Sequence, residues 1–350
     1  MTIGNTQHYT DMDPEFAEPT LTHTNSKFLK SLGGRENLPI PETVSEQRAA
    51  FDNMLNMSND INSDLNTGRK EEEVTITLRD GATVPARVYA PKEIPADGAP
   101  LVSHIHGGGF LSGNLDMDEP LCREFCDKLG CVVVNLTYRL APEHPFPIGI
   151  KDAIEGVKWR WITKAAKNGP SYGANPKKAT ILGGRSAGGN FAGVIAHLAR
   201  DEGWTPPLTG LFLSVPYLLD PSTLPEKYKD RDQSAKIDDS ITINKKTIES
   251  ILDAYKPDLT SPLFDVFNYP NGHKNLPPTY MHVCGLDPLR DEDLIFEEIL
   301  RTECDVKTRL DVYPGLPHGF WQWTKLNATK KYFNDTVEGM KWLVEQSGGA

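Results

Sequence analysis

A serine between two glycines constrains the fold of this chain more than any other feature. Ser186 has glycines two positions before it and two positions after it, Gly184 and Gly188. A short apolar run precedes the first glycine, and a helix-compatible run follows the serine as far as residue 200. A serine on so tight a turn has strained backbone angles, and glycine at the flanking positions avoids collisions with the strand and the helix. The pattern predicts a nucleophile elbow that exposes the serine Oγ.

Apolar runs typical of buried strands alternate with helix-compatible runs over most of the chain. The sheet is predicted to begin with a hairpin, strands 73–79 and 84–89, whose turn contains Asp80-Gly81. Further strands are predicted at 101–105, 131–138, 179–182, 208–215, 279–284 and 306–313. Helices are predicted at 119–129, 148–167, 187–200, 291–301 and 330–346. This alternation predicts a doubly wound, mostly parallel sheet with helices on both faces.

Two segments do not follow this alternation. Residues 1–68 are polar, with an amphipathic helix predicted at 42–57, and have too few apolar residues for a core of their own. Residues 216–278 contain no convincing strand, with a helix predicted over 242–255, and leave from the carboxyl end of a strand, where ligands bind in open α/β sheets. We therefore expect a core of residues 69–215 and 279–350, an N-terminal helical cap segment at 1–68, and a lid at 216–278. The alternative for the lid is a solvated surface insertion that does not contact substrate.

Composition and charge exclude several classes of partner. The net charge is −11, and no cluster of Lys or Arg stands out, which argues against nucleic acid and anionic membranes as partners. No run approaches the ~20 apolar residues of a spanning helix, and the first residues contain no secretory apolar region, so a cytoplasmic protein is expected. The five cysteines are expected to be reduced thiols, and no zinc-binding spacing occurs, so no metal site is predicted.

A glycine triplet follows the predicted strand 101–105, in the run His106-Gly107-Gly108-Gly109. Glycines at a strand end let backbone N–H groups point into a cleft without side-chain obstruction, as a developing oxyanion requires. An H-G-G-G loop is also the usual source of the second half of an oxyanion hole beside a nucleophile elbow. The alternative is a tight glycine turn without a chemical role.

One acid and one histidine follow the last two predicted strands. Asp287 comes directly after the strand that ends at residue 284, and His318 lies between proline and glycine after the final strand. Asp291 and Glu292 compete with Asp287, but they fall in the first turn of the next helix, where acids are expected. A histidine outside any apolar periodicity is poorly explained as a core residue. The order serine, acid, histidine is that of a catalytic triad built on a nucleophile elbow.

These motifs make the chain resemble the hormone-sensitive-lipase-like carboxylesterases of the α/β-hydrolase fold, from about residue 71 to the C-terminus. The run Tyr-Arg-Leu-Ala-Pro-Glu-His-Pro-Phe-Pro at 138–147, with Asp152 after it, also matches a stretch typical of that group. The resemblance implies the α/β-hydrolase fold and a reaction that needs no metal or organic cofactor.

The resemblance also implies a role for each residue of the motifs. The implied triad is Ser186 as nucleophile, His318 as base and Asp287 as its partner. The implied oxyanion hole consists of the N–H groups of Gly108, Gly109 and Ala187. His106 would brace the loop that begins with Gly107 without taking part in the chemistry.

The chain departs from the family pattern at two positions. Many relatives have Asp where this chain has Arg185, directly before the nucleophile, and many have Asp in place of Thr137. We expect Arg185 to pair with a nearby acid such as Glu143. The alternative is that the cation favours an anionic substrate.

The expected reaction is hydrolysis of a carboxylic ester of a small or medium-sized substrate through an acyl-enzyme. One alternative is a non-hydrolytic step, such as elimination, cyclisation or acyl transfer, in natural-product biosynthesis, because the Gly-Gly-Arg-Ser-Ala-Gly-Gly-Asn run resembles fungal members of the group. Another is a non-catalytic small-molecule receptor, although such relatives usually lose the histidine. A homodimer formed through an edge strand or the lid is one option for the assembly.

Overall fold

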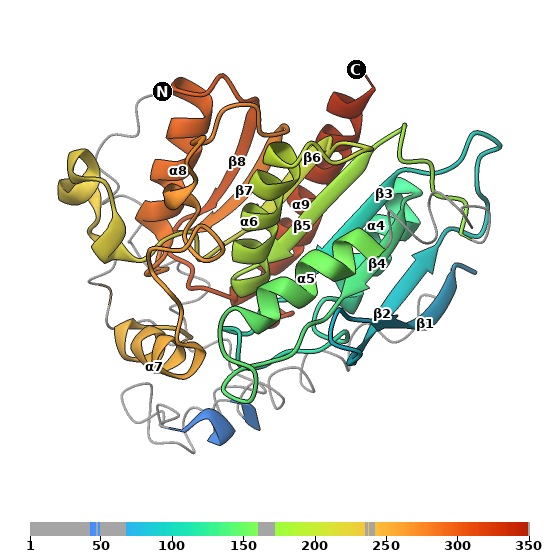
Figure 1. The fold of residues 1–350 in the computed structure, drawn as a ribbon. Helices are drawn as coiled ribbons and strands as arrows, with labels where there is room; N and C mark the ends of the chain where they lie inside the picture. The colour runs from blue at the N-terminus through green and yellow to red at the C-terminus, as the bar shows by residue number, and fades with distance from the viewer. Residues whose placement is uncertain are drawn as a thin grey trace.

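An eight-stranded sheet lies at the centre of the molecule (Figure 1). The computed structural model describes residues 43–46, 48–49, 68–159, 172–234, 237 and 242–348. The strands are β1 (Lys70–Thr77), β2 (Thr83–Ala90), β3 (Leu101–Ile105), β4 (Val132–Leu136), β5 (Thr180–Arg185), β6 (Gly210–Ser214), β7 (Thr279–Cys284) and β8 (Thr308–Tyr313). Their order in the sheet is β1-β2-β4-β3-β5-β6-β7-β8. The pairs β1 with β2 and β2 with β4 are antiparallel and all others are parallel, which confirms the predicted hairpin and mostly parallel sheet.

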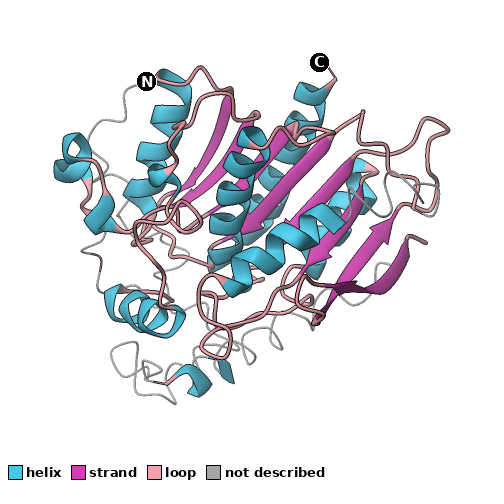
Figure 2. Cartoon of the chain, viewed as in Figure 1, coloured by secondary structure: helices cyan, strands magenta, loops and turns pink. Residues whose placement is uncertain are grey.

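Helices cover both faces of the sheet, as Figure 2 shows. In the view of Figure 1, α5 (Ile148–Trp159), α6 (Ala187–Asp201) and α8 (Arg290–Thr302) lie in front of the sheet. Behind it lie α4 (Glu119–Leu129) and α9 (Asn327–Ser347). The predicted extension of α5 to residue 167 lies outside the described residues. Within the described ranges, no helix combines the length and the apolar character that crossing a membrane requires.

Neighbouring residues of one strand belong to different cores. Ile181 of β5 is in the core that contains Phe125 of α4 and Met340 of α9, whereas Leu182 is in the core that contains Phe191 of α6. Because side chains alternate between the two faces of a sheet, a strand that supplies both cores is mostly apolar on both of its faces. This is why the predicted strands are continuous apolar runs.

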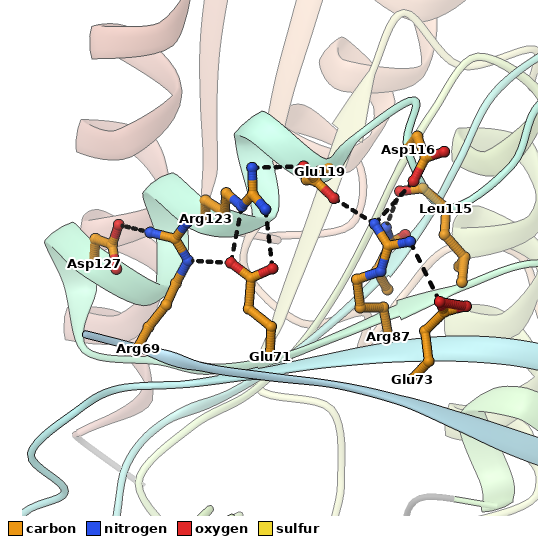
Figure 3. A network of polar contacts seen from close by, with 10 residues as sticks. Arg69, Glu71, Glu73, Arg87, Leu115, Asp116, Glu119, Arg123 and Asp127 are labelled. Carbon is orange, nitrogen blue, oxygen red and sulfur yellow. Dashed lines mark hydrogen bonds and ion pairs between the residues drawn. The ribbon is translucent and has the colours of Figure 1, made fainter. Parts of the chain in front are cut away.

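Charged side chains join the first two strands to α4 (Figure 3). Arg87 of β2 pairs with Asp116, at 2.9 Å, and with Glu119 of α4. The other pairs drawn around α4 are Arg69 with Glu71 and Asp127, Arg123 with Glu71 and Glu119, and Arg87 with Glu73. A single pair of this kind contributes little, but shared partners in a network fix the start of α4 beside the sheet.

The segment 216–278 contains short helices and, in its described part, no strand. Its elements are η6 (Pro221–Thr223), η7 (Glu226–Arg231), α7 (Lys245–Tyr255) and η9 (Val266–Asn268). The helix predicted over 242–255 therefore corresponds to α7. Asn244 ends the preceding loop, and its side chain accepts a hydrogen bond from the Thr247 N–H at 3.0 Å, which caps the helix.

Most of the N-terminal segment 1–68, including most of the helix predicted at 42–57, lies outside the described residues. The described piece is helical at residues 44–46 and 48–49. Its Arg48 donates to the backbone oxygens of Leu111, at 2.7 Å, and Ala141, at 2.9 Å. This piece therefore contacts the loop that follows the glycine triplet.

Two buried histidines join α6 to the segment 216–278. The Nδ1–H of His197 donates to the Gly193 carbonyl at 2.7 Å, and its Nε2 accepts from the Nδ1–H of His273 at 2.9 Å. Burial lowers the pKa of His197 to about 3 and the pKa of His273 to about 4. Both rings are therefore neutral near neutral pH, and the hydrogen bond between them needs a neutral His197 ring, because its Nε2 is the acceptor.

Replacing His273 with Asn is expected to make folding less sensitive to acid. Below about pH 6.5 the unfolded chain takes up protons on both rings while the folded chain does not, so the free energy of unfolding falls as the pH falls toward the folded-state pKa values. Removing the His273 ring should make the decrease in the free energy of unfolding between pH 7 and pH 5 smaller by about 2 kcal/mol. Thermal or urea unfolding of both proteins at the two pH values measures this difference. An identical pH dependence would contradict a neutral histidine pair.

Candidate active site

The loops that follow β3, β5, β7 and β8 meet at one edge of the sheet. Ser186 follows β5, Asp287 lies in the loop after β7, and His318 lies in the loop after β8. The glycine triplet follows β3. Because these four strands are parallel, their carboxyl ends lie at the same edge, which is where ligands bind in such sheets.

The turn at Ser186 has the geometry of a nucleophile elbow. Its backbone angles are φ 51° and ψ −119°, a strained region for a residue with a side chain. Its N–H donates to the Ser214 carbonyl of β6 at 2.9 Å, which holds the turn against the sheet. A Cβ on Gly188 would lie closer than 3.0 Å to the Ile105 and His106 backbone oxygens. Glycine at this position therefore lets the start of α6 pack directly on the end of β3.

The three residues of the predicted triad form one hydrogen-bonded relay. The Nε2 atom of His318 lies 3.0 Å from the Ser186 Oγ, and its Nδ1 atom lies 2.7 Å from Asp287 Oδ2. Asp287 is buried, and its second oxygen accepts from the Leu289 N–H at 3.0 Å. Since both oxygens of the carboxylate are held, the ring has its Nδ1–H toward Asp287 and its Nε2 lone pair toward Ser186.

The loops that carry the acid and the histidine are bonded to each other. The Gly285 N–H donates to the Tyr313 carbonyl at 2.9 Å, and the Leu286 N–H donates to the Leu316 carbonyl at 3.0 Å. These backbone bonds continue the pairing of β7 with β8 beyond the sheet. They bring together two side chains that are far apart in the sequence.

The glycine loop lies directly beside the nucleophile. A Cβ on Gly107 would lie 3.3 Å from the Ser186 Cβ. The buried His106 ring donates from Nδ1 to the Gly107 carbonyl at 2.7 Å and accepts at Nε2 from the Thr137 hydroxyl at 2.8 Å. Burial lowers the pKa of His106, so the ring is neutral and both of its nitrogens are used. This geometry is that of a brace for the loop.

Helix α7 packs on the same loop. A Cβ on Gly109 would lie 2.8 Å from the Ile251 Cδ1. The Phe110 ring stacks on Tyr255 with centroids 4.1 Å apart and an angle of 5° between the planes. The segment 216–278 thus contacts the glycine loop through α7.

The expectation that Arg185 pairs with a nearby acid is confirmed, but Glu143 is not that acid. Arg185 pairs with Asp118, while Glu143 pairs with Arg48 at 2.6 Å. The reason is strand alternation: Arg185 is on the same face of β5 as Ile181, toward α4 and α9, whereas Glu143 precedes α5 on the opposite face.

Asp118 is the site residue that the sequence analysis missed. It directly precedes α4, and an acid at that position is the usual sign of a helix cap, yet its side chain makes no capping hydrogen bond. It accepts instead from the His104 Nε2–H at 2.6 Å and pairs with Arg185. Burial acts to raise the pKa of Asp118, but the charge of Arg185 and the bond from His104 outweigh burial and lower the pKa to about 2. Only the fold distinguishes this role from a cap.

Neither a metal site nor the cavity beside the glycine loop defines this centre. Among the described residues, no group of three or more His, Cys, Asp or Glu side chains is arranged to hold a metal ion. A cavity of about 500 Å³ lies next to the glycine loop and is lined by Arg48, Ser112, Tyr138 and Glu143 among others, but not by the triad. The relay itself therefore defines the candidate active site.

A serine, histidine and aspartate relay beside a glycine loop, on a mostly parallel sheet, defines the class of α/β-hydrolases. Residues 102–322 match the protein family described as having the alpha/beta hydrolase fold. An AB hydrolase superfamily protein of Schizosaccharomyces pombe is 36% identical over 342 residues, which cover 97% of this chain and 95% of that protein. The chain belongs to the α/β-hydrolase family.

Two further similarities concern proteins with named activities. A versiconal hemiacetal acetate esterase of Dothistroma septosporum is 34% identical over 80% of this chain and 84% of its own length. The crystal structure of vibralactone cyclase superposes with a TM-score of 0.84 at 32% identity and covers 97% of both chains.

Replacing Gly188 with Ala is expected to destabilise the protein and to slow modification of Ser186. The added methyl group collides with the backbone of β3, so the start of α6 must move, at a cost of about 1–3 kcal/mol or more. Gly348→Ala is the matched control, because a Cβ there would lie 3.8 Å from its nearest neighbour. Thermal unfolding and the rate of fluorophosphonate labelling measure both effects. Equal behaviour of the two variants would contradict the close packing of Gly188.

Proposed function

We propose that this protein is a serine carboxylesterase that cleaves a carboxylic ester of a small or medium-sized substrate. The observation that carries the proposal is the relay in which Ser186 Oγ, the His318 ring and the Asp287 carboxylate are connected by hydrogen bonds of 3.0 and 2.7 Å. The relatives named as esterases support the same reaction.

The relay performs the reaction in two halves. The Ser186 Oγ attacks the ester carbonyl carbon while His318 Nε2 takes the hydroxyl proton, and Asp287 stabilises the resulting imidazolium. The tetrahedral intermediate then expels the alcohol, which receives that proton from His318, and an acyl-enzyme remains. A water molecule next attacks the acyl carbon as His318 takes its proton. Collapse of the second intermediate releases the acid and returns the proton to Ser186.

The negative charge of both intermediates requires donors on the side of the glycine loop. Gly108 and Gly109 are assigned this role together with Ala187, which begins α6, where N–H groups have no intrahelical partner. The contact between Gly107 and Ser186 supports the assignment, since it brings loop and elbow together. Removing one such donor typically lowers turnover by about 10²- to 10³-fold.

The segment 216–278 is assigned as a lid and the segment 1–68 as a cap of the same site. The packing of α7 on Gly109 supports the first assignment, and the bond from Arg48 to the Leu111 carbonyl supports the second. Both contacts lie on the loop that carries the proposed oxyanion donors.

A non-hydrolytic reaction is the second candidate. The similarity to a protein named vibralactone cyclase favours it, at 32% identity over 97% of both chains. The same acyl-enzyme would serve: a hydroxyl of the bound acyl group, in place of water, attacks the acyl carbon and loses its proton to His318. The bond from the acyl carbon to Ser186 Oγ then breaks, Oγ takes that proton back, and a cyclic ester is released. The hydrogen-bonded His318 argues against a receptor that has lost catalysis.

The triad variants test the proposal. Ser186→Ala is expected to abolish fluorophosphonate labelling and, like His318→Ala, to reduce turnover of p-nitrophenyl acetate or butyrate by about 10⁴- to 10⁶-fold. Asp287→Asn should reduce turnover by about 10⁴-fold, because the ring loses its correct tautomer. Ser222→Ala, at an exposed serine of the lid, should match the wild type.

The outcomes separate the candidates. Labelling of Ser186 together with a burst of p-nitrophenol supports the esterase. Labelling without hydrolysis of either ester supports the second candidate. Wild-type turnover in Ser186→Ala would contradict both.

Assembly and location complete the proposal. We infer a homodimer formed through an edge strand or the lid, and the edge strands of the described sheet are β1 and β8. Light scattering should give twice the chain mass of 38.8 kDa, and a monomer mass would contradict this inference. A cytoplasmic location remains a prediction, which cell fractionation tests.

A further inference from the structure

Arg185 directly precedes the nucleophile, but its side chain points away from the site. Only 4% of the side chain is exposed, and its partner Asp118 is completely buried. Removing two charges from water is costly, and an apolar pair of similar size is often at least as stable. Because the Arg185 side chain is buried, attraction of an anionic substrate does not explain the ion pair. A gain in folding stability does not explain it either.

On one side the ion pair connects the elbow with the glycine loop. Asp118 accepts a hydrogen bond from His104 Nε2 at 2.6 Å. His104 lies near the end of β3 and Asp118 directly precedes α4, so the two residues flank the glycine loop in the sequence. Their bond connects the two ends of the glycine loop. The ion pair of Arg185 with Asp118 joins these ends to the nucleophile turn, because Arg185 directly precedes Ser186.

On the other side Arg185 contacts the loop that carries His318. Its guanidinium carbon lies 5.1 Å from the centroid of the Trp321 ring, three residues after His318 in η10 (Phe320–Gln322). The Trp321 ring is held from elsewhere by Tyr332 of α9, which stacks on it at 4.6 Å and 15°. The Tyr332 hydroxyl lies 3.1 Å from the Ser214 Oγ, and the Ser214 carbonyl accepts from the Ser186 N–H.

We propose that Arg185 is a positioning residue, whose buried guanidinium holds the nucleophile turn, the glycine loop and the histidine loop in register through Asp118 and Trp321. The planar guanidinium suits this task, because its edge pairs with a carboxylate while its face packs on an aromatic ring. A lysine cannot make both contacts in the same way. The inference rests on the proposed serine nucleophile, and it assigns to Arg185 no contact with substrate.

The expected effect is on the chemical step. A displacement of about 1 Å between reacting groups can reduce the rate by about 10²-fold. Arg185→Met should therefore lower kcat for p-nitrophenyl acetate, and the rate of Ser186 labelling by fluorophosphonate, by about 10- to 100-fold, with KM changed by less than about 3-fold. Arg185→Lys should restore only part of both rates.

A double variant separates positioning from stability. Arg185→Met leaves the Asp118 charge buried without its cation, which lowers the melting temperature. Arg185→Met combined with Asp118→Asn removes that charge, so the melting temperature should recover while kcat and the labelling rate stay low. Arg69→Met is the matched control: it removes another largely buried arginine with two acidic partners (Figure 3), and should leave the labelling rate unchanged.

Each result decides the proposal. Wild-type kcat and labelling rate in folded Arg185→Met would overturn it, and so would recovery of both rates along with the melting temperature in the double variant. If Arg185→Met does not fold, the double variant alone decides. The wild type tests the proposed function separately: labelled Ser186 without ester turnover contradicts the esterase but leaves the labelling rates comparable, whereas an unlabelled wild type overturns both proposals.

Discussion

The arrangement of the site depends on the contact between Gly188 and the end of β3. No atom beyond the glycine backbone fits between the start of α6 and the Ile105 and His106 carbonyls. The contact places the first turn of the helix, which follows Ser186, beside the loop that leaves β3. The strained angles at the serine follow from this packing, because a short turn must connect β5 to a helix lying directly on the neighbouring strand.

The charges buried beside the Ser186 turn affect His318, the proposed general base. A lone buried cation next to the nucleophile would oppose the positive charge that His318 must take up during the reaction. Asp118 compensates the charge of Arg185, and the low pKa of its carboxyl keeps the compensation in place over the working pH range. Here the acid directly precedes α4 and the cation precedes the serine. The two positions together carry no net charge.

Local patterns in the sequence predict the strands and the turn at Ser186 well, because those features depend on neighbours in the chain. Apolar runs locate the strands within a few residues, and the glycine spacing locates the elbow at Ser186. The predicted strand 131–138 is shorter in the structure, where β4 spans Val132–Leu136. The partners of Arg185 and Glu143 were not predictable, because they depend on which face of the sheet a side chain leaves and on segments distant in the sequence. An acid before a helix gives the same local signal whether it caps the helix or neutralises a buried cation.

The glycine loop depends on contacts from the elements around it. Glycines expose backbone N–H groups, but without side chains they contribute no packing that could hold the loop in one conformation. The position of the loop must therefore come from its neighbours: the neutral His106 ring within it, Ile251 of α7 on one side, and the Asp118 and His104 bond at its base. Since α7 and the ion pair of Arg185 act on the same loop from different elements, a change at either one alters the position of the proposed oxyanion donors. The proposed lid and the buried ion pair thus both act on a segment that has little packing of its own.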